Sequence, residues 1–382
     1  MGDRDADRAK LLFVLSNDHG ELSNAMYLVT GGAFEAVLLM PERLFALNTA
    51  GLPGRAFRYG SVQDVIGSVD REAPDIVFLF SGYLYGINNL FDVDAVERLV
   101  RELRVRRRRI VTSDPFLGIQ AQLDATTFSD RHPRKAWLTG HFARLYGVFK
   151  DIPHLYLVGA EDFVGIEGIS FFNPHILVQP ADVIECRRRL DAWIGINPTR
   201  PRWLFVLSVE DYGGQVAAHG RAAFDDLLAR TLREAVQVGR QPVLVAPEVC
   251  VASLRGRRLS IPGLVCLPFC GYAVFRSLLL EAEYAFYWNI FSNTIPIRVV
   301  NRLPVFFFDP GHLAHAVPPL FTRGIQRYYA GCSLPYLDQR AGLSADVLAG
   351  LASQQEQALE PARESFRRSP SPQEMVAGIL RR

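Results

Sequence analysis

Two apolar segments in different halves of the chain have nearly the same sequence, LLFVLS at residues 11–16 and WLFVLS at 203–208. Each leads into a polar loop and then into a stretch with helical character. A continuous apolar run of this length is typical of a strand buried on both faces of a parallel sheet. The repeated order of strand, loop and helix predicts two similar α/β units in tandem.

Strand-like runs recur in both halves, with helix-like segments between most of them. The further runs are residues 35–40, 75–81, 109–113 and 154–159 in the first half and 241–247, 264–269, 282–288 and 303–310 in the second. Strands that alternate with helices form parallel sheets covered on both faces. We therefore expect an α/β fold with two Rossmann-like domains and a cleft between them.

The expected domain boundaries follow from breaks in this pattern. The cluster GINPTRPR, residues 195–202, is typical of a linker. The predicted domains are residues 1–194 and 202–343, followed by C-terminal helices over 344–382. Pro361 should kink the first of these helices, and one possibility is that the terminal helix returns across the linker to the first domain.

The balance of charge argues against a nucleic-acid binder, because 42 Lys and Arg face 40 Asp and Glu, for a net charge of +2. The basic run RELRVRRRR, residues 101–109, favours a solvated helix end that complements the helix dipole, with a nucleic-acid or membrane patch as the alternative. The first ten residues lack the apolar core of a secretory signal, and no apolar run approaches the roughly 20 residues of a membrane span. We expect a cytoplasmic protein.

Candidate catalytic residues follow the strands of the first half, because open α/β sheets bind ligands beyond the carboxyl ends of their strands. His19 follows residues 11–16 and could act as a general base on an acceptor hydroxyl; alternatively, it is a solvated residue in the first turn of a capped helix. Asp114 follows 109–113 and could orient that histidine; alternatively, it caps a helix before Pro115.

Tyr83 and Tyr85 follow the run at 75–81. They could line a pocket for the acceptor, although such an aromatic cluster is more often core packing.

Candidate donor-binding residues lie after the run at 282–288. Ser292, Asn293 and Thr294 should cap a helix whose free N–H groups could hold a diphosphate. Arg298, one turn further on, could add positive charge. The alternative is an ordinary capped helix that packs on its sheet.

The stretch LLLEAEYAFYWNIFSNTIPIRVVNRLPVFFFDPGH resembles the donor half of the GT-B glycosyltransferases, including the lipid II N-acetylglucosaminyl transferases and, more distantly, the natural-product glycosyltransferases. The resemblance implies a metal-independent, inverting transfer of a sugar from a nucleotide-diphosphate donor to a small-molecule or glycan acceptor, with no further cofactor. It also implies that His19 is the base, that Asp114 holds it, and that Asp309, Gly311 and His312 contact the donor sugar. A bacterial protein is the expected source.

Two departures from the family's pattern keep other functions open. The glutamate that binds the ribose hydroxyls in the family is missing after Thr294, where Pro296, Ile297 and Arg298 stand. The family's glycine-rich turn is replaced by Trp288, Asn289 and Phe291. One alternative is a non-catalytic GT-B-like protein that binds a ligand or a partner. Another is a nucleotide-sugar epimerase, for which Glu210, Asp211 and Asp309 are the candidate carboxylates.

No metal site is predicted. Asp92 and Asp94 open a helix, where the dipole favours acidic residues. His312 and His315 lack an evident third zinc ligand. The five cysteines have no CxxC spacing and are interpreted as small buried residues.

Overall fold

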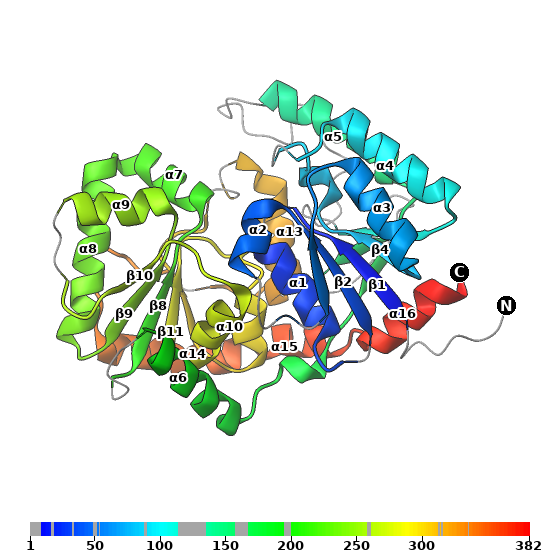
Figure 1. Ribbon diagram of the computed structural model, residues 1–382. Helices are drawn as coiled ribbons and strands as arrows, with labels where there is room; N and C mark the ends of the chain where they lie inside the picture. Colours follow the sequence, from blue (N-terminus) through cyan, green and yellow to red (C-terminus); the bar gives the residue numbers. More distant parts are fainter. Residues whose placement is uncertain are drawn as a thin grey trace. The chain divides into compact units, whose positions relative to one another are not determined.

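The structure, a computed structural model, consists of two compact units, each built around a parallel sheet (Figure 1). Unit 1 comprises residues 1–176, 316–327 and 364–382, and unit 2 comprises 177–315 and 328–363. Within the chain, the structure describes residues 9–16, 19–32, 34–48, 52, 54–87, 90–113, 135–156, 167–194, 200–257, 261–311, 314, 316–334 and 336–382.

Unit 1 holds a seven-stranded sheet of order β3-β2-β1-β4-β5-β6-β7, in which all neighbouring strands are parallel. Its strands are β1 (Lys10–Val14), β2 (Glu35–Met40), β3 (Arg55–Arg58), β4 (Ile76–Leu79), β5 (Arg109–Ser113), β6 (His154–Tyr156) and β7 (Gly168–Ser170). Its helices are α1 (His19–Val29), α2 (Glu42–Leu47), α3 (Val62–Glu72), α4 (Val93–Val105) and α5 (Lys135–Phe149), with short 3-10 turns at Gly82–Leu84 and Pro174–Ile176.

Unit 2 holds a five-stranded parallel sheet of order β10-β9-β8-β11-β12. Its strands are β8 (Arg202–Val206), β9 (Gln241–Val245), β10 (Val265–Leu267), β11 (Tyr284–Tyr287) and β12 (Val305–Phe307). Its helices are α6 (Pro180–Ile194), α7 (Val209–His219), α8 (Arg221–Gln237), α9 (Glu248–Gly256), α10 (Tyr272–Glu281), α11 (Ile295–Val300) and α14 (Ala345–Ala358). The predicted fold of two Rossmann-like α/β domains is confirmed, because β1 to β5 of unit 1 are arranged in the same order as the five strands of unit 2.

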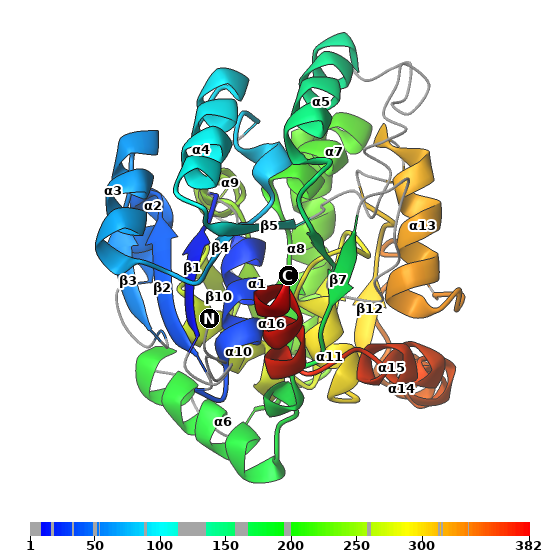
Figure 2. The same ribbon diagram turned by 90° about the vertical axis from the view of Figure 1, so that its right-hand side faces the viewer.

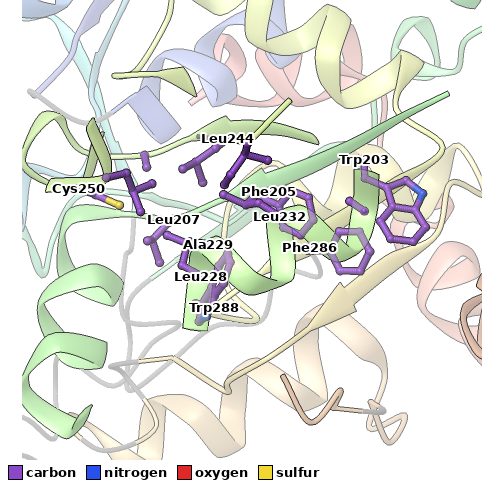
Figure 3. Close-up of a cluster of buried hydrophobic side chains, with 14 of the residues drawn as sticks. Trp203, Phe205, Leu207, Leu228, Ala229, Leu232, Leu244, Cys250, Phe286 and Trp288 are labelled. Atoms are coloured by element: carbon purple, nitrogen blue, oxygen red, sulfur yellow. The ribbon is translucent and has the colours of Figure 1, made fainter. Parts of the chain in front are cut away.

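The core of unit 2 lies between its sheet and the helices α7, α8 and α9. Trp203 and Phe205 from β8 and Phe286 from β11 are fully buried against Leu228 and Leu232 from α8 (Figure 3). Phe205 and Phe286 stack with ring centroids 4.7 Å apart. Full burial of such side chains contributes roughly 1.5–3 kcal/mol each, so this layer fixes the positions of the strand ends.

The helix α6 belongs to unit 2, whereas residues 180–194 were predicted to close the first domain. Its Arg187 and Asp191 form ion pairs with Glu281 and Arg202, respectively, and Arg202 also pairs with Glu281 at 3.1 Å. Arg202 and Glu281 are buried, so the pairs are shielded from water. These contacts hold α6 on unit 2, which places the boundary between units near residue 176.

The C-terminal helices divide between the two units rather than forming one separate layer. The helix α14 lies in unit 2, the short helix α15 (Glu360–Arg367) crosses the boundary, and α16 (Pro372–Arg381, red in Figure 2) lies in unit 1. Ser371 begins α16 with a capping box formed with Glu374. Arg109 at the start of β5 donates to the carbonyl of Leu380 at 2.8 Å, so the terminal helix does return to the first unit.

Pro361 lies in the first turn of α15, because the predicted long helix is broken at Leu359 into α14 and α15. The helix α13 (Pro318–Tyr329) also spans the unit boundary. No helix in the described part of the chain is long and apolar enough to cross a membrane.

Candidate ligand site at the strand ends of each unit

In both sheets the strand order reverses at one place, between β1 and β4 in unit 1 and between β8 and β11 in unit 2. Loops diverge there to opposite faces of the sheet, and ligands of open α/β sheets bind in the resulting crevice beyond the carboxyl ends of the strands. The loops after these four strands are therefore the candidate sites.

A hydrogen-bonded serine and aspartate follow β8, one at the end of the loop and the other in the first turn of α7. Ser208 caps α7, because its Oγ accepts the N–H of Asp211 at 3.0 Å, and the same hydroxyl donates to Asp211 Oδ2 at 2.7 Å. Asp211 is buried, with only 2% of its surface exposed. Its carboxylate is thus held in one orientation at the end of the sheet.

Asn289 ties the loop after β11 to this aspartate. Its Nδ2 donates to Asp211 Oδ2, and its Oδ1 accepts the N–H of Phe291 at 3.1 Å. The side chain of Asn289 therefore bridges the two loops on either side of the strand reversal and also folds its own turn.

The loop after β12 packs directly on Asn289. Asp309 Oδ1 accepts the N–H of Gly311 at 2.8 Å, and Gly311 has a φ of +98°. A Cβ at Gly311 would lie 2.5 Å from Cβ of Asn289, so only glycine permits this approach. Three loops of unit 2 thus meet in one junction, which we call the polar junction: Ser208, Asp211, Asn289, Asp309 and Gly311.

The predicted serine, asparagine and threonine lie beside this junction. Thr294 immediately precedes α11 but makes no side-chain capping bond; instead its Oγ1 lies 2.8 Å from Ser292 Oγ and 3.3 Å from the Tyr287 hydroxyl. Asn293 is partly exposed between them. The expectation that these side chains cap the helix is wrong, because the hydroxyls of Ser292 and Thr294 bond to side chains of the turn and the strand.

Arg298 is fully buried, which does not fit its predicted contact with a diphosphate. Its guanidinium donates to the backbone carbonyls of Leu279, Ala282, Glu283 and Pro304 at 2.5–3.2 Å. Burial lowers the pKa of Arg298 to about 10, so the group stays protonated at neutral pH. The arginine fastens α11 to α10 and β12, and every N–H of the guanidinium already has an acceptor.

The strand ends of unit 2 carry negative charge. The described residues just after its strands, in 207–211, 246–250, 268–272, 288–295 and 308–311, include the four carboxylates Glu210, Asp211, Glu248 and Asp309 and no lysine or arginine. A phosphate group bound there would rely on N–H and hydroxyl donors rather than on a cation from these loops.

Aromatic side chains fill the corresponding place in unit 1. The hydroxyl of Tyr85 donates to the carbonyl of Val14 at 2.9 Å, and that of Tyr59 donates to the carbonyl of Leu15 at 2.5 Å. Tyr85 is fully buried and Tyr59 nearly so. Burial, followed by the nearby Glu21, raises the pKa of the Tyr59 hydroxyl well above its usual range.

Tyr83 is also fully buried, and its hydroxyl lies 2.8 Å from His154 Nε2. His154 Nδ1 lies 2.7 Å from the carbonyl of Ile152, which can only accept, so Nδ1 carries the proton and Nε2 accepts from Tyr83. Burial lowers the pKa of His154 to about 4. The predicted acceptor-lining role of Tyr83 and Tyr85 does not fit these positions, and the alternative of core packing does.

The catalytic residues proposed from sequence lie at the edge of what the structure describes. His19 is the first residue of α1, the helix that follows β1, but its side chain lies outside the described residues, as do Asp114 and His312. Ser113, at the end of β5, accepts the N–H of Ser81 at 2.6 Å through its Oγ. Ser81 has a φ of +45°, which is uncommon for a residue with a side chain and is most often found at turns and functional sites.

Within the described residues, no three His, Cys, Asp or Glu side chains come together in a way that could hold a metal ion.

Comparison with known proteins finds likeness only at the level of structure. No protein-family model matches the sequence, and no curated protein matches it. The glycosyltransferase VinC, whose solved structure is in complex with dTDP, matches with a TM-score of 0.52 and 14% identity over 97% of this chain and 98% of that one. Os79 from O. sativa, in complex with UDP, matches with a TM-score of 0.53 and 12% identity over 97% and 99%. The chain has a GT-B-like fold.

A third structure, of the calicheamicin glycosyltransferase CalG4, agrees with a TM-score of 0.50 and 13% identity over 98% of this chain and 99% of that one. Because these matches span nearly the whole of each chain, the GT-B-like fold covers both units. The narrower resemblance to the lipid II N-acetylglucosaminyl transferases stays a prediction.

Sequence reasoning missed part of the arrangement at the strand ends. Tyr59 was overlooked because it follows β3, whose sequence RAFR gives no apolar run. Glu21 is nearly inaccessible and accepts the N–H of Ser16 at 2.5 Å, but in the sequence it looks like an ordinary acidic residue in a first helical turn. In the sequence, Asn289 is recognised only as a residue that replaces part of a glycine-rich turn. Its hydrogen bond to Asp211 becomes visible only in the folded structure.

Proposed function

We propose that the protein is a glycosyltransferase that moves a sugar from a nucleotide-diphosphate donor to a small-molecule or glycan acceptor. The observation that carries the proposal is the polar junction at the strand reversal of unit 2, in a chain whose GT-B-like fold is matched over almost its full length. Two of the matched structures are described as complexes with nucleoside diphosphates, dTDP and UDP, which supports this donor class.

The donor would bind over the junction. The hydroxyls of Ser292 and Thr294 and the amide of Asn293 lie in the turn that Asn289 holds, so they are the candidate contacts to the diphosphate. Asp309 and Gly311, with His312 next to them, are the candidate contacts to the donor sugar. Arg298 has no part in this proposal beyond fixing α11.

The acceptor would bind to unit 1, where His19 is the candidate general base and Asp114 the candidate carboxylate that orients it. The position of His19 at the first residue of α1, next to the strand reversal, supports this role. A base that deprotonates the acceptor hydroxyl for direct attack on the anomeric carbon would give inversion. The reaction as proposed uses no metal ion.

A second candidate is a non-catalytic GT-B-like protein. The acidic strand ends of unit 2 and the use of Arg298 within the fold favour it, because neither supplies the positive charge that a diphosphate attracts. The missing ribose-binding glutamate favours it as well.

Titration calorimetry with UDP, dTDP, GDP and CDP tests the donor site first. We expect one nucleotide to bind, and Asn289→Ala to weaken its binding about tenfold or more, because the turn loses its link to Asp211. Asn301→Ala is the matched control, since Asn301 bonds to Ile297 and Val178 away from the junction. It should lower stability and leave nucleotide affinity unchanged.

The acceptor half needs a separate readout. Once a nucleotide is known, sugar transfer from its sugar conjugates should be lost in His19→Ala with donor affinity retained. Full turnover in this variant would remove His19 from the mechanism. If no nucleotide binds, the non-catalytic candidate replaces the transferase.

A further inference from the structure

The C-terminal end of α4 and the adjoining start of β5 form a strongly basic surface on unit 1. Arg101 and Arg104 lie on the last turns of α4, and Arg107 lies in the turn that follows; all three are exposed. In the described part of the chain their guanidinium groups have no hydrogen bond or ion pair. Exposed Val105, 73% accessible, stands between them.

The C terminus brings further arginines to the same end of the sheet. The bond from Arg109 to the carbonyl of Leu380 holds the end of α16 at the start of β5, so exposed Arg381 and Arg382 lie beside this surface. In Figure 2, α4, β5 and α16 all face the viewer. The basic face thus comprises eight arginines: Arg101, Arg104, Arg106, Arg107, Arg108, Arg109, Arg381 and Arg382.

Acidic residues neutralise only part of this face. Asp70 and Glu102 both pair with Arg106, and Glu167 pairs with Arg382. Asp75 lies at the start of β4, next to Pro74, whose carbonyl accepts from Arg108. Four carboxylates therefore stand against eight arginines. The neighbouring end of β1 and β2 is balanced instead, because Lys10 pairs there with Glu35 and Glu72.

Arg107 occupies a position where its side chain is costly. The N–H groups of Arg107 and Arg108 bond to the carbonyls of Arg104 and Leu103, which is the Schellman pattern that ends many helices. This motif needs a left-handed residue, usually glycine, and Arg107 has a φ of +52°. An arginine here adds charge to the surface at the expense of backbone strain.

We propose that this basic face docks unit 1 on an anionic phospholipid surface. A cluster of four to eight arginines or lysines on a surface is sufficient for attraction to anionic headgroups, and each contributes about fivefold in partitioning near the membrane. An apolar side chain among the arginines suits the interface between headgroups and acyl chains. A single-stranded nucleic acid fits less well, because the eight arginines of the face have no aromatic side chain among them for base stacking, and binding to a duplex is an outcome of the test below.

The basic face lies at the amino ends of the strands, since α4 ends there and β5 begins there. The strand ends of unit 1 that follow β1 and β4 are at the opposite edge of the sheet. Docking would therefore turn those ends toward the aqueous side. The inference does not depend on sugar transfer, because vesicle binding needs no donor.

Cosedimentation of the full chain with vesicles tests the proposal. We expect the protein to bind vesicles of phosphatidylcholine mixed with phosphatidylglycerol and not to bind vesicles of pure phosphatidylcholine. Added salt should release the bound protein from the vesicles. The triple variant Arg101→Gln, Arg104→Gln, Arg107→Gln should lower the partition coefficient on the order of 100-fold. Arg188→Gln, Arg189→Gln, Arg340→Gln removes the same charge from exposed sites of unit 2 and should bind as the unchanged protein does.

A single variant distinguishes an effect of charge on vesicle binding from an effect of lowered stability. Arg107→Gly relieves the left-handed strain, so it should raise the melting temperature while lowering vesicle binding about fivefold. The proposal is overturned if the unchanged protein does not bind anionic vesicles, or if the triple variant or Arg107→Gly binds them as strongly as the unchanged protein. It is also overturned if the protein binds a DNA or RNA duplex in preference to vesicles at the same salt concentration.

Discussion

The strand reversal between β1 and β4 and the one between β8 and β11 occupy equivalent places in two sheets whose first five strands have the same order, yet the described side chains at the two places differ. In unit 1, Tyr59 and Tyr85 close the strand ends with hydroxyls bonded to backbone carbonyls. In unit 2, Asp211 and Asn289 leave a polar junction that joins three loops. Among the described residues, the same topology thus carries aromatic side chains at the strand ends of one unit and polar side chains at those of the other.

The largest expected effect concerns Arg298, whose removal tests whether unit 2 uses this buried cation for folding. Arg298→Met should lower the free energy of unfolding by about 4 kcal/mol or more, because carbonyls in α10 and before β12 lose their donor. Arg302→Met, which removes a half-exposed ion pair just after the same helix, should cost less than about 1 kcal/mol. Denaturant titration compares the two. A stable Arg298→Met protein that has lost nucleotide affinity would restore the diphosphate role.

The junction itself should be sensitive to a single methyl group. Gly311→Ala combines a left-handed φ with a contact to Asn289, so we expect a loss of about 2–4 kcal/mol together with weaker nucleotide binding. Gly239→Ala has a φ of +78° and open space around its Cβ, and should cost about 1 kcal/mol with no change in binding. Equal losses in both variants would mean that the close approach to Asn289 contributes nothing.

Low pH should affect the stability of the two units differently. His154 in unit 1 is buried with its pKa lowered to about 4, so between pH 6.5 and 4 the unfolded chain binds a proton that the folded chain does not. Stability from this group is therefore present at neutral pH and is lost as the pH falls, by roughly 2 kcal/mol at pH 5. The described histidine of unit 2, His219, is exposed.

The contribution of His154 to the pH dependence of stability can be measured by comparing two proteins. Denaturation of the unchanged protein and of His154→Gln at pH 7 and pH 5 isolates it, because the carboxylates titrate in both proteins. Parallel pH profiles for the two would show that His154 is not buried as a neutral base.

The smallest expected changes in stability come from two variants, one at each strand reversal. Tyr85→Phe removes one buried hydroxyl from unit 1 and should cost about 1 kcal/mol of stability without changing nucleotide binding. Asn289→Ala should cost a similar amount in unit 2 and weaken nucleotide binding. If both variants bind nucleotide equally well, the contrast between the two strand reversals has no functional meaning.

Much of the fold could be predicted because buried parallel strands have a strong signal. The runs at residues 35–40 and 109–113 coincide with β2 and β5, whereas β3 and β7 were missed, being short and bordered by polar or glycine residues. Other predicted runs, such as 303–310, were a few residues longer than their strands because apolar residues continue into the loops.

The site was harder to predict, since its residues act through partners that lie far apart in the sequence. Arg298 looked like a cation available to a ligand, and only the fold shows that carbonyls from residues 279–283 and from Pro304 enclose it. Asp211 and Asn289 are 78 residues apart, so no local pattern could pair them. Tyr83 and Tyr85 follow a strand as ligand-binding residues often do, but the glycines beside them let α5 cover the turn.

The division of α16 and α14 between the units has a consequence for synthesis on the ribosome. A nascent chain that has completed all seven strands of unit 1 still lacks the segments 316–327 and 364–382, which are made only after the whole sheet of unit 2. Arg109, at the start of β5, is therefore made long before its partner Leu380, because more than half of the chain is translated between them. Unit 1 is completed last although it is begun first, so a premature stop after unit 2 would leave the older unit unfinished.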